Sequence, residues 1–217
     1  MRNAHRWLLV LGTLVVGLMV AAPPAQAIVF DLTGDHCTGT CGTPPFGTVT
    51  LLQNGANVDV TVDLSGTNEF VKTGAVDFQA FKFNGTGVAL GDISVDQTVA
   101  GQTLAPQTGA FNGDGTGHFI FGIKCTTCGN GASDEFDDNI VFHVAKATIA
   151  DLTAPNLLGN VFVADIIGSN GKTGPVYATT PRPTPRTPVP EPSSLLLLGS
   201  GLVGLGVVRP WTVRRRP

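Results

Sequence analysis

The chain has 217 residues, 42% of them hydrophobic, and a formal net charge of −3. This small charge hides an acidic body, because residues 28–176 hold 15 acidic residues, five lysines and no arginine, a net charge of −10. Such a balance argues against binding of nucleic acid or anionic lipid through a basic patch. A body of this length is one ordinary domain with a single core.

The N-terminus has the pattern of a secretory signal peptide over residues 1–27. Arg2 and Arg6 provide the positive start, Trp7 to Val20 the apolar segment, and Ala25-Gln26-Ala27 the small residues before a cleavage site. We expect cleavage between Ala27 and Ile28. An uncleaved membrane anchor is the alternative, which the two prolines at 23 and 24 before the cleavage pattern disfavour.

Residues 28–176 predict an all-β domain, because apolar and polar residues alternate between turns and no sustained helical period occurs. We expect an antiparallel β-sandwich that is jelly-roll-like, with about seven to nine strands and a barrel as the alternative. The clearest hairpin is Thr48 to Leu64, where a two-residue Asn54-Gly55 turn would place Leu51 opposite Val58.

Further strands are expected after this hairpin, some of them apolar on both faces as in the centre of a sheet. Their ranges are Val76 to Phe83 with a bulge near Gln79-Ala80, Phe119 to Ile123, Ile140 to Ile149, and Val161 to Ile167.

The four cysteines, Cys37, Cys41, Cys125 and Cys128, form two close pairs. In an exported chain an even count predicts disulfides, and the sequence leaves local and long-range connectivities open. A zinc site with four thiolate ligands is the competing interpretation, and a redox Cys-x-x-Cys motif at residues 125–128 is a third.

Acidic turns offer a weak calcium site. Its candidates are Asp134, Glu135, Asp137 and Asp138, and Asn112-Gly113-Asp114-Gly115 resembles a fragment of a calcium loop. Neither segment has the complete EF-hand spacing, so solvated turns explain them more simply. No other cofactor is expected.

Catalytic residues are not predicted. His36, His118 and His143 are the histidines of the body, and no nucleophile elbow, zinc-protease motif or phosphate loop accompanies them. We therefore expect a protein that is not an enzyme, with a hydrolase whose site is assembled in space as the remaining alternative.

The C-terminal part begins with a Pro- and Thr-rich linker, residues 177–188, and continues with a sorting or anchor segment, residues 189–217. In this segment Pro190-Glu191-Pro192 should stay extended, because proline fixes φ and lacks an amide donor. The apolar run Leu195 to Val208 and the terminal Arg214 to Arg216 predict a transmembrane helix with its tip in the cytoplasm, once flanking residues lengthen the run. A buried core helix is the alternative.

The order of Pro190-Glu191-Pro192, an apolar run and arginines resembles the PEP-CTERM sorting signal of exported bacterial proteins. The resemblance implies that an exosortase recognises Pro190, Glu191 and Pro192 in a chain held at the cytoplasmic membrane. The processed protein would then belong to the envelope surface or extracellular matrix. The interruption from Arg209 to Val213 departs from the family pattern and puts efficient processing in doubt.

For the function of the body, these observations favour a non-catalytic surface or matrix-associated protein. The alternative is a calcium-assisted module that binds extracellular polysaccharide, although the body lacks tryptophan and therefore has few sugar-stacking surfaces.

Overall fold

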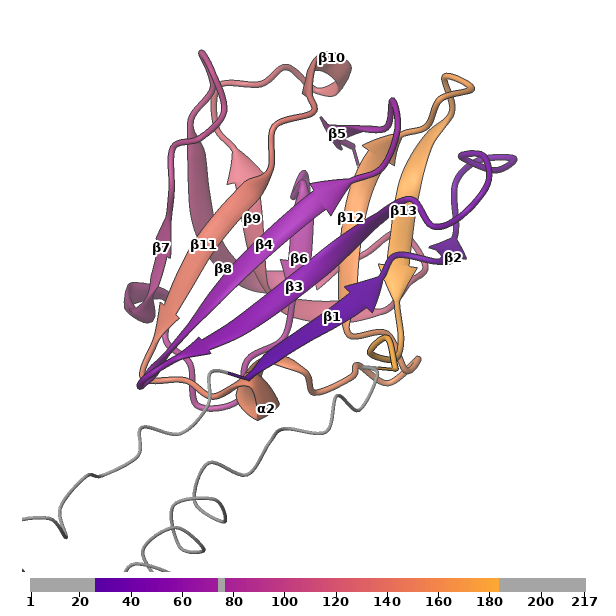
Figure 1. The fold of residues 1–217 in the computed structure, drawn as a ribbon. Helices are drawn as coiled ribbons and strands as arrows, with labels where there is room; N and C mark the ends of the chain where they lie inside the picture. Colours follow the sequence, from indigo (N-terminus) through magenta and orange to yellow (C-terminus); the bar gives the residue numbers. More distant parts are fainter. Residues whose placement is uncertain (1–25, 74–76, 184–217) are drawn as a thin grey trace, which may run out of the picture. The chain divides into compact units, whose positions relative to one another are not determined.

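The computed structural model describes residues 26–73 and 77–183, which form two antiparallel β-sheets packed as a sandwich (Figure 1). The first sheet has the order β1 (Ala27–Asp31), β3 (Gly47–Asn54), β4 (Asn57–Leu64), β11 (Ile140–Ala145), β7 (Ile93–Val95). The second has the order β10 (Gly131–Phe136), β5 (Glu69–Lys72), β12 (Phe162–Ile167), β6 (Phe81–Phe83), β9 (His118–Cys125), β8 (Leu104–Asn112); β13 (Thr173–Ala178) also pairs with β12, and β2 (Gly34–Asp35) with β13. The expected all-β class and sandwich are confirmed, while the jelly-roll winding stays a prediction.

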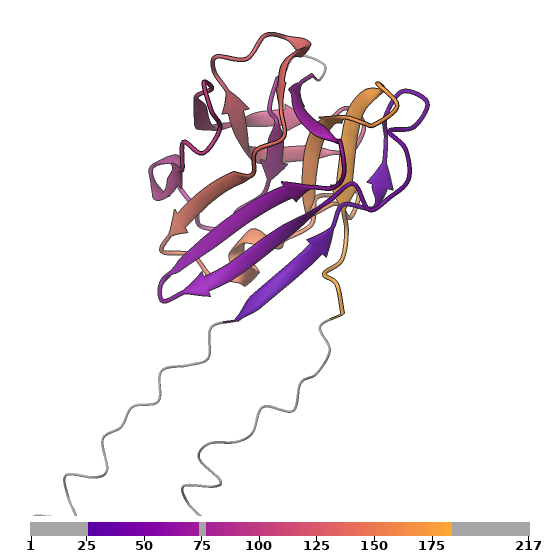
Figure 2. The ribbon, with the colours of Figure 1, turned by 45° about the horizontal axis from the view of Figure 1, so that its top comes forward.

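Two short helices complete the described part of the chain, the 3₁₀ helix η1 (Leu90–Asp92) and α2 (Ile149–Leu152). Figure 2 shows the two sheets from a second direction, with α2 at one end of the sandwich. The strands outnumber the seven to nine expected because β2, β5, β6 and β7 are only two to four residues long.

The expected hairpin is β3–β4, but its expected register is wrong. Leu51 lies opposite Val60, because the turn consists of Gly55 and Ala56 and Asn54 faces Asn57. Gly55 has a φ of +60° and is the only central residue with positive φ, as in a type II′ turn. The register shift is two residues, so every side chain keeps its expected face.

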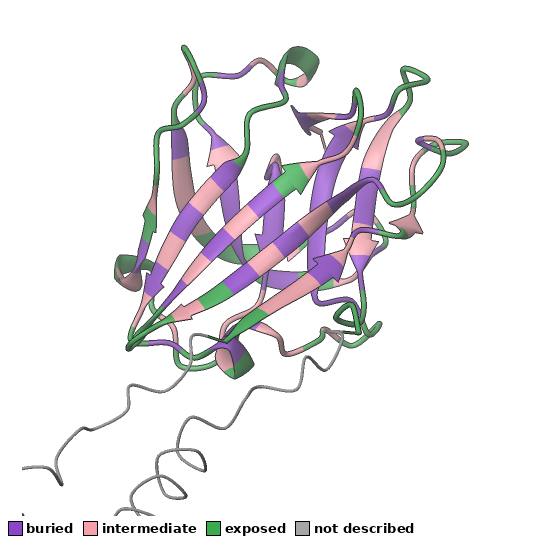
Figure 3. Ribbon diagram, viewed as in Figure 1, coloured by how far each residue is buried: buried purple, intermediate pink, exposed green. Residues whose placement is uncertain are grey.

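Burial alternates along these strands, and Figure 3 shows the alternation as purple bands on β3, β4 and β11. The core between the sheets is aromatic at its centre. Phe81 of β6 packs on Phe142 of β11, with ring centroids 6.0 Å apart, and on Phe162 of β12 at 5.8 Å. Phe81 and Phe142 come from different sheets, so their contact joins the two layers.

Two expected strands are shorter in the structure because the backbone turns into the left-handed region. Phe78 has a φ of +54°, and β6 begins only at Phe81. Lys146 has a φ of +56° directly after β11, and Thr148 then caps α2. The sequence pattern concealed both turns, since neither residue is a glycine.

The domain extends beyond the expected boundary at Val176. Strand β13 runs to Ala178, and Pro181 pairs with Phe30 of β1. Arg182 then forms an ion pair with Asp31, in which Nε donates to Oδ2 at 2.9 Å. Residues 177–182 therefore belong to the sandwich, and the compact unit that contains it ends at Arg182.

Candidate functional site

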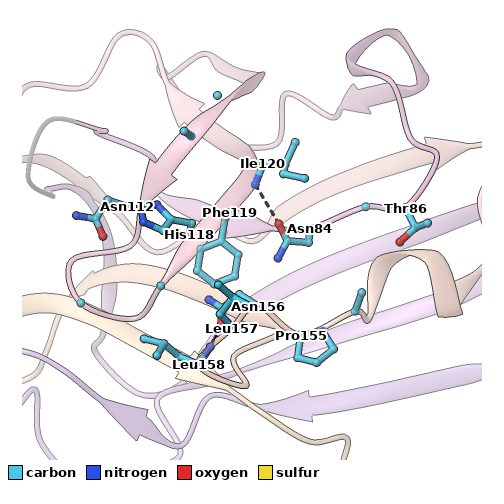
Figure 4. A pocket seen from close by; sticks show the side chains of 16 residues that line it. Asn84, Thr86, Asn112, His118, Phe119, Ile120, Pro155, Asn156, Leu157 and Leu158 are labelled. Atoms are coloured by element: carbon cyan, nitrogen blue, oxygen red, sulfur yellow. Dashed lines mark hydrogen bonds between the residues drawn. The ribbon is translucent and has the colours of Figure 1, made fainter.

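An open groove of about 750 Å³ lies beside the β8–β9 turn. Figure 4 shows side chains from three segments around it: the end of β6, the β8–β9 turn, and the loop that precedes β12. Its lining includes Asn84, Asn112, His118, Phe119, Ile120, Pro155, Asn156, Leu157 and Leu158. A volume in this range is typical of small-ligand sites.

Asn156 organises the loop on one side of the groove. Its Oδ1 accepts hydrogen bonds from the backbone amides of Leu158 at 2.9 Å and Asn160 at 3.1 Å. Its Nδ2 donates to the carbonyl of Thr116 at 2.8 Å, which fastens the loop to the β8–β9 turn. The neighbouring Gly117 has a φ of +99°, and a Cβ there would lie 2.4 Å from Asn156. Glycine is therefore required for this close approach.

The groove presents apolar side chains to solvent. Leu157 is fully exposed, and Leu158 and Ile120 are 62% and 51% exposed. Ile120 is exposed although it lies in the central strand β9, since it points to the outer face. Of the three histidines His36, His118 and His143, only His118 lines the groove. The arrangement suits binding of a partly apolar ligand and offers no paired acid and base.

His143 lies elsewhere, on the outer face of the first sheet between two carboxylates. Its Nδ1 is 2.7 Å from Asp59 Oδ1 of β4, and its Nε2 is 3.2 Å from Asp96 Oδ2 after β7. The bond to Asp59 raises the pKa of His143, partial burial opposes the rise, and Asp96 adds to it. Both ring nitrogens are engaged, so the cluster is an ion-pair clamp across three strands.

The cysteines form two local disulfides, Cys37–Cys41 and Cys125–Cys128, with Cα–Cα distances of 5.6 and 5.4 Å. The connectivity that the sequence left open is therefore the local one. Bonded sulfurs are not thiolates, so this state has no zinc ligands of the kind weighed above.

Asp35 organises the first disulfide loop. Its carboxylate accepts hydrogen bonds from the backbone amides of Cys37 at 2.9 Å and Cys41 at 3.0 Å, and from Thr40 Oγ1 at 2.6 Å. Burial opposes ionisation of Asp35, but these three bonds outweigh it and lower the pKa. His36 points away to the other side, against the turn at Gly115.

The four acidic candidates lie in and just after strand β10. Asp134 and Glu135 lie in the edge strand β10 rather than in a turn, and Asp134 Oδ2 accepts a hydrogen bond from the amide of Gly129 at 3.0 Å. Asp138 Oδ2 accepts a hydrogen bond from the backbone amide of Ala100 at 3.4 Å.

Over residues 26–73 and 77–183, the one group of three potential metal ligands with atoms within 4.8 Å is Asp35, Cys37 and Cys41. Both of its cysteines are in a disulfide. Asp134, Glu135, Asp137 and Asp138 do not form such a group, and a calcium site at these residues stays a prediction.

One pair of functional groups escaped the sequence analysis. Lys82 of β6 and Asp165 of β12 are fully buried and form an ion pair at 2.7 Å. The signal was present, since each is a charged residue inside an otherwise apolar run. A buried charge without a nearby partner in sequence implies a partner in space.

The predicted sorting residues Pro190, Glu191 and Pro192 lie outside the described residues. Residues 1–25 of the predicted signal peptide lie outside them as well. A comparison with protein-family models bears on this tail. The family model of the PEP-CTERM protein-sorting motif matches residues 188–209.

The chain carries a PEP-CTERM sorting motif.

The PEP-CTERM match spans the three predicted recognition residues and the predicted apolar run, and it stops at Arg209, where the interruption begins. It marks a protein that is secreted and processed by an exosortase. The match covers the tail alone and says nothing about the activity of the sandwich. No curated protein and no solved structure matches the chain.

Within the described ranges, no helix of this PEP-CTERM protein is long and apolar enough to cross a membrane. The transmembrane helix expected around Leu195 to Val208 falls outside those ranges and stays a prediction.

Proposed function

We propose that this protein is a non-catalytic β-sandwich of the bacterial cell surface or extracellular matrix, delivered there by exosortase processing of its C-terminal segment. The observation that carries the proposal is the PEP-CTERM motif at residues 188–209. The motif follows a folded unit that ends at Arg182, so a processing enzyme would act on chain beyond the sandwich.

The chemistry of the described domain supports a non-catalytic role. His143, the histidine with the most developed polar surroundings, has both ring nitrogens bound to carboxylates, and neither nitrogen is left to act as a base. The net charge of −10 over residues 28–176 favours dispersion outside the cell and disfavours a nucleic-acid partner.

The decisive experiment follows the size and location of the protein in bacteria with and without the matching exosortase. With the enzyme we expect a shorter, released form, and without it a longer form that stays with the membrane fraction. Replacing Pro190, Glu191 and Pro192 together by alanine should reproduce the second result. The matched control replaces Pro181, Pro183 and Pro185 instead and should leave processing unchanged. Equal size and location in both strains would refute the proposal.

A second candidate function is binding of extracellular polysaccharide, with calcium as a helper. The groove favours it, because the amides of Asn84, Asn112 and Asn156 stand beside apolar side chains that suit the C–H faces of sugars. Glycan binding that is lost in the exposed-site variants Leu157→Asp and Ile120→Asp would support this function. Loss of that binding with a chelator would extend the support to calcium. Binding that survives both substitutions would place any glycan site elsewhere.

A further inference from the structure

The buried ion pair between Lys82 and Asp165 has the geometry of two groups about to react. Nζ of Lys82 lies 2.7 Å from Oδ2 of Asp165, and both side chains have no exposed surface. The two residues stand on neighbouring strands: Lys82 is opposite Val163, and Asp165 is two residues further along the same face of β12. Diagonal neighbours of this kind are within reach of a long side chain.

Residues 77–80, just before β6, explain why this pair is buried on the outer face of the second sheet. Strands β5 and β6 both pair with β12, β5 through Ile166 and Ile167 and β6 through Phe162 to Ala164. Asp165 lies at the junction between them, where its amide donates to the carbonyl of Ala80 at 3.0 Å. The residues just before β6 therefore lie over the pair.

This covering segment brings a third carboxyl group to the same place. Oδ1 of Asp77 is 3.6 Å from Nζ of Lys82, and the Asp77 side chain is 6% exposed. The carbonyl of Gln79 accepts a hydrogen bond from the same Nζ at 3.3 Å. One amine thus faces two carboxyl groups inside the protein.

The surroundings favour neutral groups over charged ones. Burial raises the pKa of Asp165 to about 7, although Lys82 acts in the opposite direction, and burial also raises the pKa of Asp77. Oδ1 of Asp165 and Oδ2 of Asp77 are buried and have no hydrogen-bond partner in the structure. In such a place burial favours the neutral carboxylic acid form of Asp165 over its carboxylate.

We propose that Lys82 and Asp165 become joined by an intramolecular isopeptide bond, with Asp77 as the group that moves protons. The neutral Nζ attacks Cγ of the protonated Asp165 carboxyl group and forms the N–C bond. The Asp77 carboxylate takes a proton from the nitrogen and gives it to the departing hydroxyl group. The C–O bond then breaks, one water molecule leaves, and Asp77 returns to its starting state. No atom changes oxidation state, so no further reactant is required.

The bond would tie β6 to β12 across a sequence separation of 83 residues. The two disulfides span separations of only four and three residues, so they do not connect distant parts of the sandwich. An amide also survives reducing agents, which a disulfide does not. The proposal concerns the sandwich itself and does not depend on how the tail is sorted.

The test is the mass of the full chain as secreted by its host, measured after reduction under denaturing conditions, with both chain ends identified by peptide mapping. We expect the mass to be lower than the sequence mass by one water molecule. Tandem mass spectrometry of a digest should show the peptide with Lys82 joined to the peptide with Asp165.

Variants test whether the loss of water depends on Lys82 and Asp77. Lys82→Arg keeps a cation, and Asp77→Asn keeps the shape of the side chain. Each variant should have the full mass of its own sequence, with no loss of water. The matched control is Lys146→Arg, because Lys146 forms an exposed pair with Asp92 at a similar distance of 3.0 Å. This control should keep the water loss. A full sequence mass in the unaltered protein, or a water loss that persists in Lys82→Arg, would overturn the proposal, and a loss that persists in Asp77→Asn would overturn the role of Asp77.

Discussion

At the scale of single residues, the clamp at His143 makes the stability of the sandwich depend on pH. The hydrogen bond that His143 donates to Asp59 raises the folded pKa of His143 above its ordinary value of 6.5. The folded state therefore binds the proton more tightly than the unfolded state does. The stabilisation from His143 is fully present below pH 6.5 and is lost as pH rises through the raised folded pKa.

Asp59→Asn should lower the pKa of His143, because it removes the largest cause of the rise. The measurement is the NMR titration of the imidazole protons, together with urea unfolding midpoints on both sides of pH 6.5. Asp63→Asn, on the same strand and without a bond to His143, is the control and should leave the titration unchanged. An unaltered His143 titration in Asp59→Asn would contradict the clamp.

Residues also differ in how far their roles could be read in advance. Lys82 and Asp165 are recognisable as charges within apolar strands, and the burial of their strands follows from that pattern. The contact between Lys82 and Asp165 does not follow from the sequence pattern, because the order of the strands decides which residue lies beside Lys82. The same holds for Asp59 of β4, His143 of β11 and Asp96 just after β7, which are polar residues from three separate parts of the chain.

At the scale of elements, the β3–β4 turn illustrates a backbone requirement that is free of packing effects. Gly55 has a φ of +60°, and a Cβ at this position would meet no heavy atom within 4 Å. Gly55→Ala should therefore lower the free energy of unfolding by about 1–2 kcal/mol, the usual cost of a left-handed residue with a side chain.

The control for this turn is Gly91→Ala. Gly91 also has open space around it, but its φ lies outside the strained range. Urea unfolding of both variants measures the free energy of unfolding, and we expect Gly91→Ala to lower it little or not at all. Equal losses at the two sites would show that the type II′ turn is not the cause.

Elements with a strict two-residue alternation were predictable down to the face that each side chain occupies. The β3–β4 register was not predictable, because a turn at Asn54-Gly55 and a turn at Gly55-Ala56 keep the same faces, so alternation does not distinguish them. The acidic segment with Asp134 and Glu135 was predicted to form turns, but it pairs with β5 and forms the edge strand β10. Pairing with a neighbour overrides a weak local preference.

At the scale of the whole molecule, the sandwich closes through its two ends. Besides the pairing of β13 with β12 and β2, three backbone hydrogen bonds depend on residues after Val176: Val161 to Ala178 at 2.9 Å, Thr33 to Tyr177 at 3.1 Å, and Arg182 to Val29 at 2.6 Å. A chain from Ile28 to Arg182 should therefore be more stable than one that ends at Val176. At about 1 kcal/mol for each bond, these three alone contribute roughly 3 kcal/mol to the difference.

Urea unfolding of the two purified chains measures this difference directly. The ion pair of Arg182 with Asp31 is partly exposed and adds little, so Arg182→Ala in the longer chain should cost less than 1 kcal/mol, as about 0–1 kcal/mol is usual for such pairs. Equal unfolding midpoints for the two chains would place the end of the domain at Val176 after all.

The amino-acid sequence by itself determined the class of fold, the buried faces of the main strands and the sorting motif of the tail. Each of these is written locally, in alternation, composition or a short motif. Only the tertiary structure decided the local disulfide connectivity, the groove beside Asn156 and the buried meeting of Lys82, Asp165 and Asp77. These features join residues far apart in the chain or depend on a backbone turn that local pattern does not reveal. Their physical cause is the order in which strands pair and the burial that this order imposes.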